Sequence, residues 1–196
     1  MNNCFVILAA GKSKRFHKNT AKQFYNYKNK EIIDHSIEKS VNSKLFKKIL
    51  VVTNNIKHLK KKQIHNSVKI IKGGKERSDS SLLALKYIKK FKPTNVLIHD
   101  AARPNFSIRL LNKLIASLKK NKASIPVISS KDSIKYKVKN QLFNLNRNSS
   151  YLTQTPQAFK FNRILNAHLK FKNKNFTDDS IILSKNGIKI NPIEGK

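Results

Sequence analysis

The sequence has a single cysteine, Cys4, and no apolar run long enough to cross a membrane. One cysteine excludes a disulfide framework, and because Cys4 lies inside an apolar stretch we expect its thiol to be buried. The first residues also lack a charged leader followed by a long apolar segment. These absences favour a cytoplasmic protein without membrane contact, whose 196 residues can form a core without disulfides or metal.

Arginine is scarce, although the formal charge is +32 and there are 42 basic residues. A chain that uses lysine for ordinary positive charge is expected to keep arginine where a rigid, two-pronged donor must bind phosphate or carboxylate. The arginines are Arg15, Arg77, Arg103, Arg109, Arg147 and Arg163. The rarity of arginine therefore marks these positions as candidates for function.

The strong positive charge raises a nucleic-acid alternative, because a basic surface attracts phosphate backbones. The lysines are spread along the whole chain, and aromatic residues do not alternate with them in an RNA-binding pattern. The chain is also rich in Asn and Ile, which indicates biased nucleotide composition in the source. We therefore expect solvated lysine faces and no dedicated nucleic-acid surface. A non-catalytic basic protein that binds nucleic acid or an acidic partner stays open as an alternative.

Apolar segments and helical patterns alternate along the chain. The segments that read as buried strands are residues 6–9, 49–54, 68–71, 96–99 and 123–128. The helical patterns cover residues 31–41, 78–91 and 108–118. This alternation predicts an α/β fold in which helices cover both faces of an open, mostly parallel sheet. No repeat or low-complexity linker divides the chain, so residues 1–196 are expected to form one domain.

One segment departs from this alternation. Residues 133–147, "SIKYKVKNQLFNLNR", alternate apolar and polar residues on both sides of a polar turn, which predicts a β-hairpin. An isolated hairpin is barely stable, so this one is expected to pack on a partner subunit or on the edge of its own sheet. The pattern leaves both alternatives open.

Candidate ligand-binding residues follow the predicted strands, where open α/β sheets bind ligands. After the first strand, "AAGKSKRF" (residues 9–16) combines small residues with three cations, which fits a triphosphate. This stretch lacks both the P-loop arrangement and the three-glycine dinucleotide fingerprint. After the third strand, Gly73 and Gly74 permit a close backbone approach, and Ser80 or Ser81 could bond a base or ribose.

The fourth strand ends in "LIHDAARPNF" (residues 97–106). Asp100 could bind a divalent cation or orient a hydroxyl group, and Arg103 could bind a second phosphate. The simpler alternative is that Asp100 caps the turn and pairs with Arg103. The six histidines show no metal-ligand spacing, and no nucleophilic Ser or Cys lies in an elbow motif, which argues against zinc and hydrolase chemistry.

Several of these stretches together resemble a known family. "AAGKSKRF", "AKQF", "GGKERSDSS", "IHDAARP", "RNSSYLTQTPQAF" and "TDDS" occur in the order and spacing of 2-C-methyl-D-erythritol 4-phosphate cytidylyltransferases. The match covers essentially the whole chain. It implies a Rossmann-like, three-layer nucleotidyltransferase fold with a protruding hairpin arm at about residues 132–150. Ribitol 5-phosphate cytidylyltransferases share the layout but usually carry Ser-Val where this chain has Ala101 and Ala102, and that substrate stays the alternative.

The resemblance implies a role for each matched position. The residues that it assigns to catalysis are Arg15, Lys22 and Arg147. Those that it assigns to CTP are Ala9, Ala10, Gly11, Gly74 and Ser80. Those that it assigns to the sugar phosphate are Asp100, Arg103, Ser133 and Thr155. The implied cofactor is Mg²⁺, held mostly by the phosphates of CTP, with Asp100 as its candidate protein ligand.

The implied reaction is attack by a phosphate oxygen of methylerythritol phosphate on the α-phosphorus of CTP, with release of pyrophosphate. Such a transfer needs two mutually repelling anions to be aligned, and cations where charge develops. The hairpin resembles the family's dimerisation arm, which implies a homodimer in which Ser133 and Arg147 enter the neighbouring subunit's site.

The chain departs from the family pattern at a few positions. Ser13, Ala21 and Lys75 stand where the family usually has Gly, Pro and an acidic residue. Family members also continue beyond the equivalent of Lys196 with a segment whose lysine contacts the sugar phosphate, and some are fused to a cyclodiphosphate synthase. We therefore expect this sequence to be a fragment or the front part of a longer protein.

Overall fold

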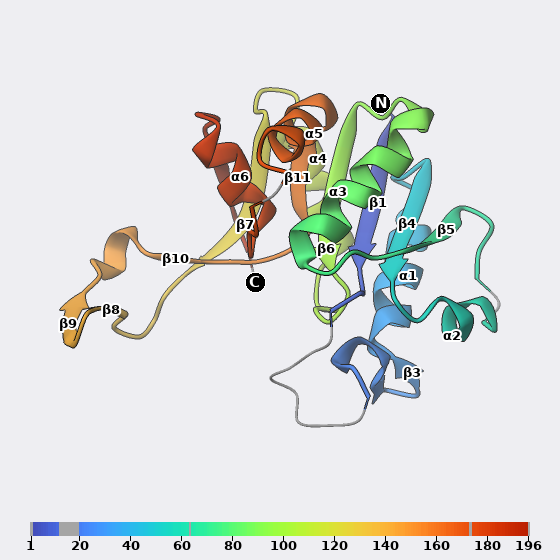
Figure 1. Ribbon diagram of the computed structural model, residues 1–196, viewed down its shortest axis with the longest axis horizontal. Coiled ribbons are helices and arrows are strands. Elements are labelled where there is room, and N and C mark those ends of the chain that lie inside the picture. The colour runs from blue at the N-terminus through green and yellow to red at the C-terminus, as the bar shows by residue number, and fades with distance from the viewer. Residues whose placement is uncertain (1, 12–19, 63, 173, 196) are drawn as a thin grey trace.

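The computed structural model describes residues 2–11, 20–62, 64–172 and 174–195 (Figure 1). Its centre is an eight-stranded sheet in the order β10-β7-β11-β6-β1-β4-β5, with β12 pairing with β7 outside this path. The strands are β1 (Asn3–Leu8), β4 (Lys48–Thr53), β5 (Val68–Lys72), β6 (Asn95–Asp100), β7 (Ala123–Ser129), β10 (Tyr151–Thr153), β11 (Gln157–Lys160) and β12 (Asn191–Glu194).

The sheet is mostly parallel around β1. β1 pairs in parallel with β4 and β6, and β4 pairs in parallel with β5. The exceptions are β11, which is antiparallel to β6 and β7, and β10, which is antiparallel to β7. The five predicted strands are therefore confirmed as strands of one mostly parallel sheet.

Helices cover both faces of this sheet, as the alternation in the sequence predicts. They are α1 (Ile32–Asn42), α2 (Ile56–Lys60), α3 (Arg77–Ile88), α4 (Ile108–Ser117), α5 (Phe161–Lys170) and α6 (Asp179–Lys185). One core joins α3, α5 and α6 to the sheet, and the other joins α1, α2 and α4 to the opposite face. Side chains of β1 alternate between the two, with Val6 in the first core and Phe5 in the second.

Most apolar positions of the predicted strands and helices are buried, with an exception in α3. Cys4 is fully buried, and this burial raises the pKa of its thiol to about 11, so the thiol behaves as a small apolar side chain. Leu83, however, is exposed on α3, although the apolar pattern of that segment includes it. Ser80 and Ser81 are buried instead, because α3 turns its serine-rich N-terminal turns toward the protein interior.

The residues after 128 contain elements that the alternating pattern did not predict. Besides β10 and β11, these are helices α5 and α6 and the strand β12. Among the residues that the structure describes, short 3₁₀ segments are η1 (Lys22–Phe24), η2 (Lys89–Phe91) and η3 (Arg147–Ser149). None of the helices in the described part of the chain combines the length and apolarity that a membrane crossing requires.

The predicted hairpin is present as β8 (Lys135–Val138) and β9 (Gln141–Asn144), which pair in antiparallel fashion. Figure 1 shows this arm standing away from the rest of the domain, joined to it by the chain after β7 and before β10. A smaller two-stranded sheet, β2 (Asn26–Tyr27) and β3 (Lys30–Glu31), precedes α1. The β8–β9 hairpin forms a sheet of its own. It therefore does not pack on the edge of the central sheet, which was one of the two alternatives.

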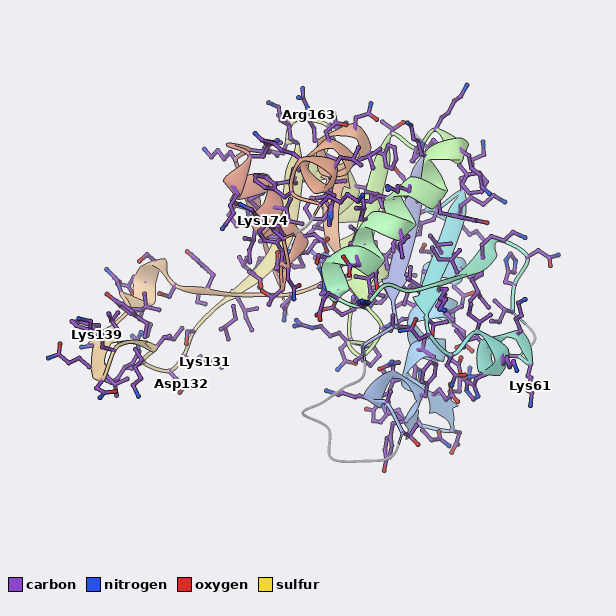
Figure 2. The ribbon with its side chains drawn as sticks, in the orientation of Figure 1. Lys61, Lys131, Asp132, Lys139, Arg163 and Lys174 are labelled. Carbon is purple, nitrogen blue, oxygen red and sulfur yellow. The ribbon has the colours of Figure 1, made fainter. Side chains whose placement is uncertain are left out.

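Positive side chains lie on widely separated parts of the molecule (Figure 2). Lys139 lies at the tip of the arm, Arg163 and Lys174 lie near α5 and α6, and Lys61 lies beside α2. These labelled cations therefore do not gather on one surface.

Candidate active site

The loops that follow β1, β4, β5 and β6 meet at one edge of the sheet. Ala9 N donates to Val52 O (2.7 Å), Gly73 N donates to Thr53 O (3.2 Å), and Ala101 N donates to Leu8 O (3.0 Å). These bonds extend the strand pairing past the formal strand ends. The residues predicted to bind CTP and the sugar phosphate at these ends are therefore brought to the same edge.

Gln23 holds the chain directly after β1. Its side-chain Nε2 donates to Ala9 O (2.8 Å) and to Gly11 O (2.9 Å), and the residue is buried. On the other side, Asn54 Nδ2 donates to Ala10 O (3.3 Å). Two amide side chains thus fix the backbone of the predicted triphosphate-binding turn. The sequence reading assigned no role to Gln23, although it belongs to the quoted stretch "AKQF".

The glycines after β5 are required by their surroundings. A Cβ atom at Gly73 would lie 2.3 Å from Ala10 Cβ, and one at Gly74 would lie 2.3 Å from Asp79 Cβ. Gly73 therefore lets the end of β5 pack against the turn after β1. Ser80 Oγ accepts from Gly74 N (3.1 Å) and donates to Glu76 O (3.2 Å), so in this structure its hydroxyl holds the glycine turn to α3.

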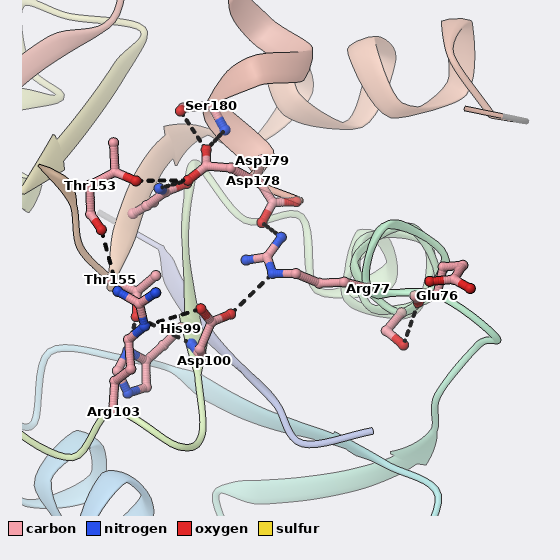
Figure 3. Close-up of polar contacts among 12 residues, drawn as sticks. Glu76, Arg77, His99, Asp100, Arg103, Thr153, Thr155, Asp178, Asp179 and Ser180 are labelled. Carbon is pink, nitrogen blue, oxygen red and sulfur yellow. Dashed lines mark hydrogen bonds and ion pairs between the residues drawn. The ribbon is translucent and has the colours of Figure 1, made fainter. Parts of the chain in front are cut away.

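Asp100, at the end of β6, lies between two guanidinium groups (Figure 3). Its Oδ1 accepts from Arg77 Nε at 3.1 Å, and its Oδ2 lies 3.5 Å from Arg103 Nε. Arg103 also donates from Nη1 to Thr153 O (3.3 Å). The predicted pairing of Asp100 with Arg103 is present. Arg77 is a second cation beside Asp100, and the family resemblance gave it no role.

Arg77 continues into a buried polar cluster. Its Nη1 donates to Asp179 Oδ2 at 2.6 Å, and Asp179 Oδ1 lies 3.0 Å from His168 Nε2. Asp179 is fully buried, which alone would raise the pKa of its carboxyl, but Arg77 and His168 hold that pKa well below its usual range. Likewise, burial alone would lower the pKa of Arg77, and the two carboxylates raise it above its usual value. Arg77 and Asp179 are therefore both charged throughout the pH range of biochemical work.

Thr155 reaches the site from the chain between β10 and β11. Its Oγ1 accepts from Asp100 N (3.3 Å) and lies 2.9 Å from His99 Nδ1, while His99 Nε2 lies 3.3 Å from Ser36 Oγ. Complete burial, together with the charge of nearby Arg103, lowers the pKa of His99 to about 3. His99 is thus neutral, and a neutral ring donates to one of the two hydroxyls and accepts from the other.

A cavity of about 560 Å³ opens beside Arg103 and Thr155. Three cations line it, Arg103, Arg109 and Lys113, together with one carboxylate, Glu194, and apolar atoms of the loop before α4. Its volume suits a small ligand, and its positive balance suits an anion. Arg109 is one of the scarce arginines but belongs to no quoted motif. Because it lines this cavity, it lies next to the candidate site.

Not every predicted site residue is brought together here. Arg15 lies outside the described residues, and Lys22 is exposed next to Gln23. Ser133 and Arg147 belong to the arm, which stands away from the site of its own chain (Figure 1). The structure therefore groups the two predicted substrate regions but leaves Ser133 and Arg147 apart from them.

Asp100 is the candidate protein ligand for the Mg²⁺ that the resemblance implies. Among the described residues, no group of three or more His, Cys, Asp and Glu side chains is arranged to hold a metal. Asp100 offers a carboxylate at the site, but each of its oxygens already faces a guanidinium group. This environment favours a role for Asp100 in orienting arginines and a hydroxyl group over a role as a metal ligand.

The fold and this edge of small residues, glycines and arginines define an α/β nucleotidyltransferase, and solved structures have the same fold. A 4-diphosphocytidyl-2C-methyl-D-erythritol synthase from Anaerococcus prevotii superposes with a TM-score of 0.86 at 26% identity, over 100% of this chain and 89% of that one. The 2-C-methyl-D-erythritol 4-phosphate cytidylyltransferase of Francisella tularensis gives a TM-score of 0.81 at 29% identity, over 99% and 90%.

The model of the IspD family, 2-C-methyl-D-erythritol 4-phosphate cytidylyltransferase, matches residues 3–196. This chain belongs to that family. A bifunctional enzyme IspD/IspF from Pelagibacter ubique is 47% identical over 100% of this chain and 53% of its own length. A cytidylyltransferase from Caldicellulosiruptor bescii is 38% identical over 99% of this chain and 88% of its own length. The chain thus spans about half of the bifunctional relative and most of the single-function one.

Proposed function

We propose that this chain joins CTP and 2-C-methyl-D-erythritol 4-phosphate to give 4-diphosphocytidyl-2-C-methyl-D-erythritol and pyrophosphate. The observation that carries the proposal is the family match over residues 3–196. The convergence of the turn after β1, the Gly73–Gly74 turn and the Asp100–Arg103 pair at one edge supports it. A cytoplasmic location is part of the proposal, since the proposed substrates are phosphorylated metabolites.

In this proposal CTP lies over the turn after β1. The small side chains of Ala9 and Ala10 and the backbone of Gly11 let the triphosphate approach the chain closely, and Gln23 keeps that backbone in place. Lys22 and Arg15 stabilise the charge that develops at the α-phosphorus. Ser80 acts by holding the Gly74 turn against which the base is expected to lie.

The sugar phosphate is proposed to lie beside Asp100, Arg103 and Thr155, in the cavity that Arg103 and Thr155 line. Arg103 binds the phosphate as a two-pronged donor, and Asp100 accepts a hydroxyl of the sugar. Mg²⁺ accompanies CTP and offsets the repulsion between the two anions. The protein then contributes alignment and fixed positive charge, which is what phosphoryl-type transfer mainly needs.

A homodimer formed through the arm completes the proposed site. The arm exposes a concentration of large apolar side chains: Tyr136, Val138, Leu142, Phe143 and Leu145. Such a surface on a hairpin remote from its own domain favours contact with a second copy. Ser133 and Arg147 would then serve the partner's sugar-phosphate site.

Pyrophosphate release tests the proposed function. The protein is incubated with CTP and Mg²⁺ and with either methylerythritol phosphate or ribitol 5-phosphate. We expect turnover with methylerythritol phosphate and a specificity constant for ribitol 5-phosphate that is lower by at least about a hundredfold, since the site must match the substrate's hydroxyl groups. Equal turnover with ribitol 5-phosphate, or turnover with neither, would contradict the proposal.

A further inference from the structure

A single arginine joins the candidate site to the protein interior. Arg77, at the start of α3, contacts Asp100 at the end of β6 through Nε and Asp179 at the start of α6 through Nη1 (Figure 3). The contact between Arg77 and Asp179 spans 102 positions in the sequence. Three elements that are distant along the chain are therefore held by one guanidinium group.

The inner half of this chain of contacts cannot reach a substrate. Asp179 has no exposed surface, and its partner His168 is 3% exposed. A buried carboxylate is costly unless its charge is matched and its oxygens are bonded. Here one oxygen faces Arg77 at 2.6 Å and the other faces His168 at 3.0 Å. Asp179 is thus a fixed anchor that can influence a bound substrate only through Arg77.

The outer half is less constrained. Asp100 is 29% exposed and Arg103 is 53% exposed, and the contact between them is the longer one, at 3.5 Å. The contact between Asp100 and Arg77 is 3.1 Å, and Arg77 itself is mostly buried. Arg77 is therefore the rigid partner of Asp100, whereas Arg103 lies at the open cavity and can turn toward a ligand.

We propose that Arg77 is a positioning residue: held by Asp179 and His168, it fixes the Asp100 carboxylate in the direction that the sugar phosphate requires. Lysine cannot replace it, because one ammonium group does not present two donors in a fixed fork to two carboxylates. Arg77 is one of the few arginines in a lysine-rich chain, which agrees with a need for that fork. The proposal rests on the proposed function, since it assigns Asp100 to the sugar phosphate.

Steady-state kinetics of the full protein test the proposal with the variants Arg77→Lys and Asp179→Asn. Loss of a contact that the bound sugar phosphate makes equally in the ground state and the transition state raises KM and leaves kcat unchanged. We expect the KM for the sugar phosphate to rise about tenfold or more in both variants, while the KM for CTP stays within about twofold. The matched controls are Arg163→Lys on α5 and Ile182→Val in the core beside Asp179, and both should leave the two KM values unchanged.

The double variant separates positioning from a general structural effect. If Arg77 and Asp179 act as one unit, Arg77→Lys combined with Asp179→Asn should raise the KM for the sugar phosphate no more than Arg77→Lys alone. Additive effects would overturn the proposal. An equal rise in both KM values would also overturn the proposal. A fall in kcat alone would overturn it too, because a smaller folded fraction lowers kcat without changing either KM.

A crystal structure of Asp179→Asn gives a readout that does not need activity. The Asp100 carboxylate should rotate away from the direction seen here, with its Oδ1 no longer near Arg77 Nε. An unchanged Asp100 would overturn the proposal even in an active enzyme. Failure of the proposed function is distinguishable, because the unmodified protein would then release no pyrophosphate while the rotation of Asp100 could still be measured.

Discussion

At the scale of single residues, the site depends on side chains that are already bonded to the protein. Asp100, Thr155 and Ser80 are each bonded to other protein groups, so their first task is to hold turns and neighbouring elements in place. Two cations assigned to the site, Arg103 and Lys22, are exposed. This division between fixed turns and accessible cations suits a site that aligns two anions.

Lys22→Ala is expected to lower kcat about a hundredfold, because the variant loses a cation aimed at the charge of the transition state. The dissociation constant for CTP should change much less. Lys57→Ala, an exposed lysine on α2, is the matched control and should behave like the unmodified protein. Kinetics and equilibrium CTP binding measure the two effects separately. An equal loss in both would mean that Lys22 only anchors the bound substrate.

His99 predicts a dependence of stability on pH. Its pKa is about 3 in the folded chain against 6.5 as the ordinary value, so below pH 6.5 the unfolded chain takes up a proton that the folded chain refuses. This contribution to stability is complete above pH 6.5 and is lost as the pH falls toward 3, by up to about 1.4 kcal/mol per pH unit.

Urea unfolding at several pH values measures this contribution. In His99→Gln the free energy of unfolding should fall less steeply between pH 6.5 and 3. The difference in slope should correspond to the uptake of up to one proton on unfolding. His65→Asn, at an exposed position, is the control and should keep the slope of the unmodified protein. Identical slopes in His99→Gln and the unmodified protein would contradict the assignment of a neutral, buried His99.

At the scale of elements, strand ends could be predicted from the sequence and tertiary pairings could not. Strands β1, β4, β5, β6 and β7 follow from apolar, β-branched runs, and "AAG", "GG" and "HD" mark where those runs end. Helix α5 had a readable signal, since Phe161, Ile164, Leu165 and His168 share one buried face. The contact of Asp179 with Arg77 had no readable signal in the sequence, because nothing near either residue indicates that the two meet.

Gly73→Ala tests the packing between the end of β5 and the turn after β1. The new Cβ would lie 2.3 Å from Ala10 Cβ, which forces the two turns apart and is expected to cost about 1–3 kcal/mol of unfolding free energy. Ala10→Gly removes the opposing atom, so the double variant should recover a large part of that loss. Thermal or urea unfolding checks both values. Without any recovery, contact with Ala10 would not be the reason for the glycine.

At the scale of the whole molecule, the strong positive charge and the arm have different consequences. The labelled basic side chains lie on distant surfaces (Figure 2), and the interpretation of the charge as background stays a prediction. The arm, by contrast, concentrates exposed apolar side chains in one protruding hairpin. The sequence predicted the hairpin itself from its alternating pattern but left open whether a second copy covers it.

Leu142→Asp tests the dimer that the arm is proposed to form. Leu142 is 66% exposed on β9, and a charge there should convert the dimer to a monomer by placing an uncompensated carboxylate in the interface. Leu169→Asp, at an exposed position on α5, is the control and should leave the assembly unchanged. Analytical ultracentrifugation gives the molecular mass of each form. A protein that is already monomeric without substitution would contradict the proposed dimer.

Two phosphate-bearing substrates are proposed to meet at the edge where β1, β5 and β6 end. A crystal structure of the protein with CTP and Mg²⁺ bound would show whether they do. We expect the triphosphate over Ala10 and Gly11, within reach of Lys22, and the base beside Gly74. A triphosphate bound anywhere else, with this edge empty, would rule out this placement of the substrates.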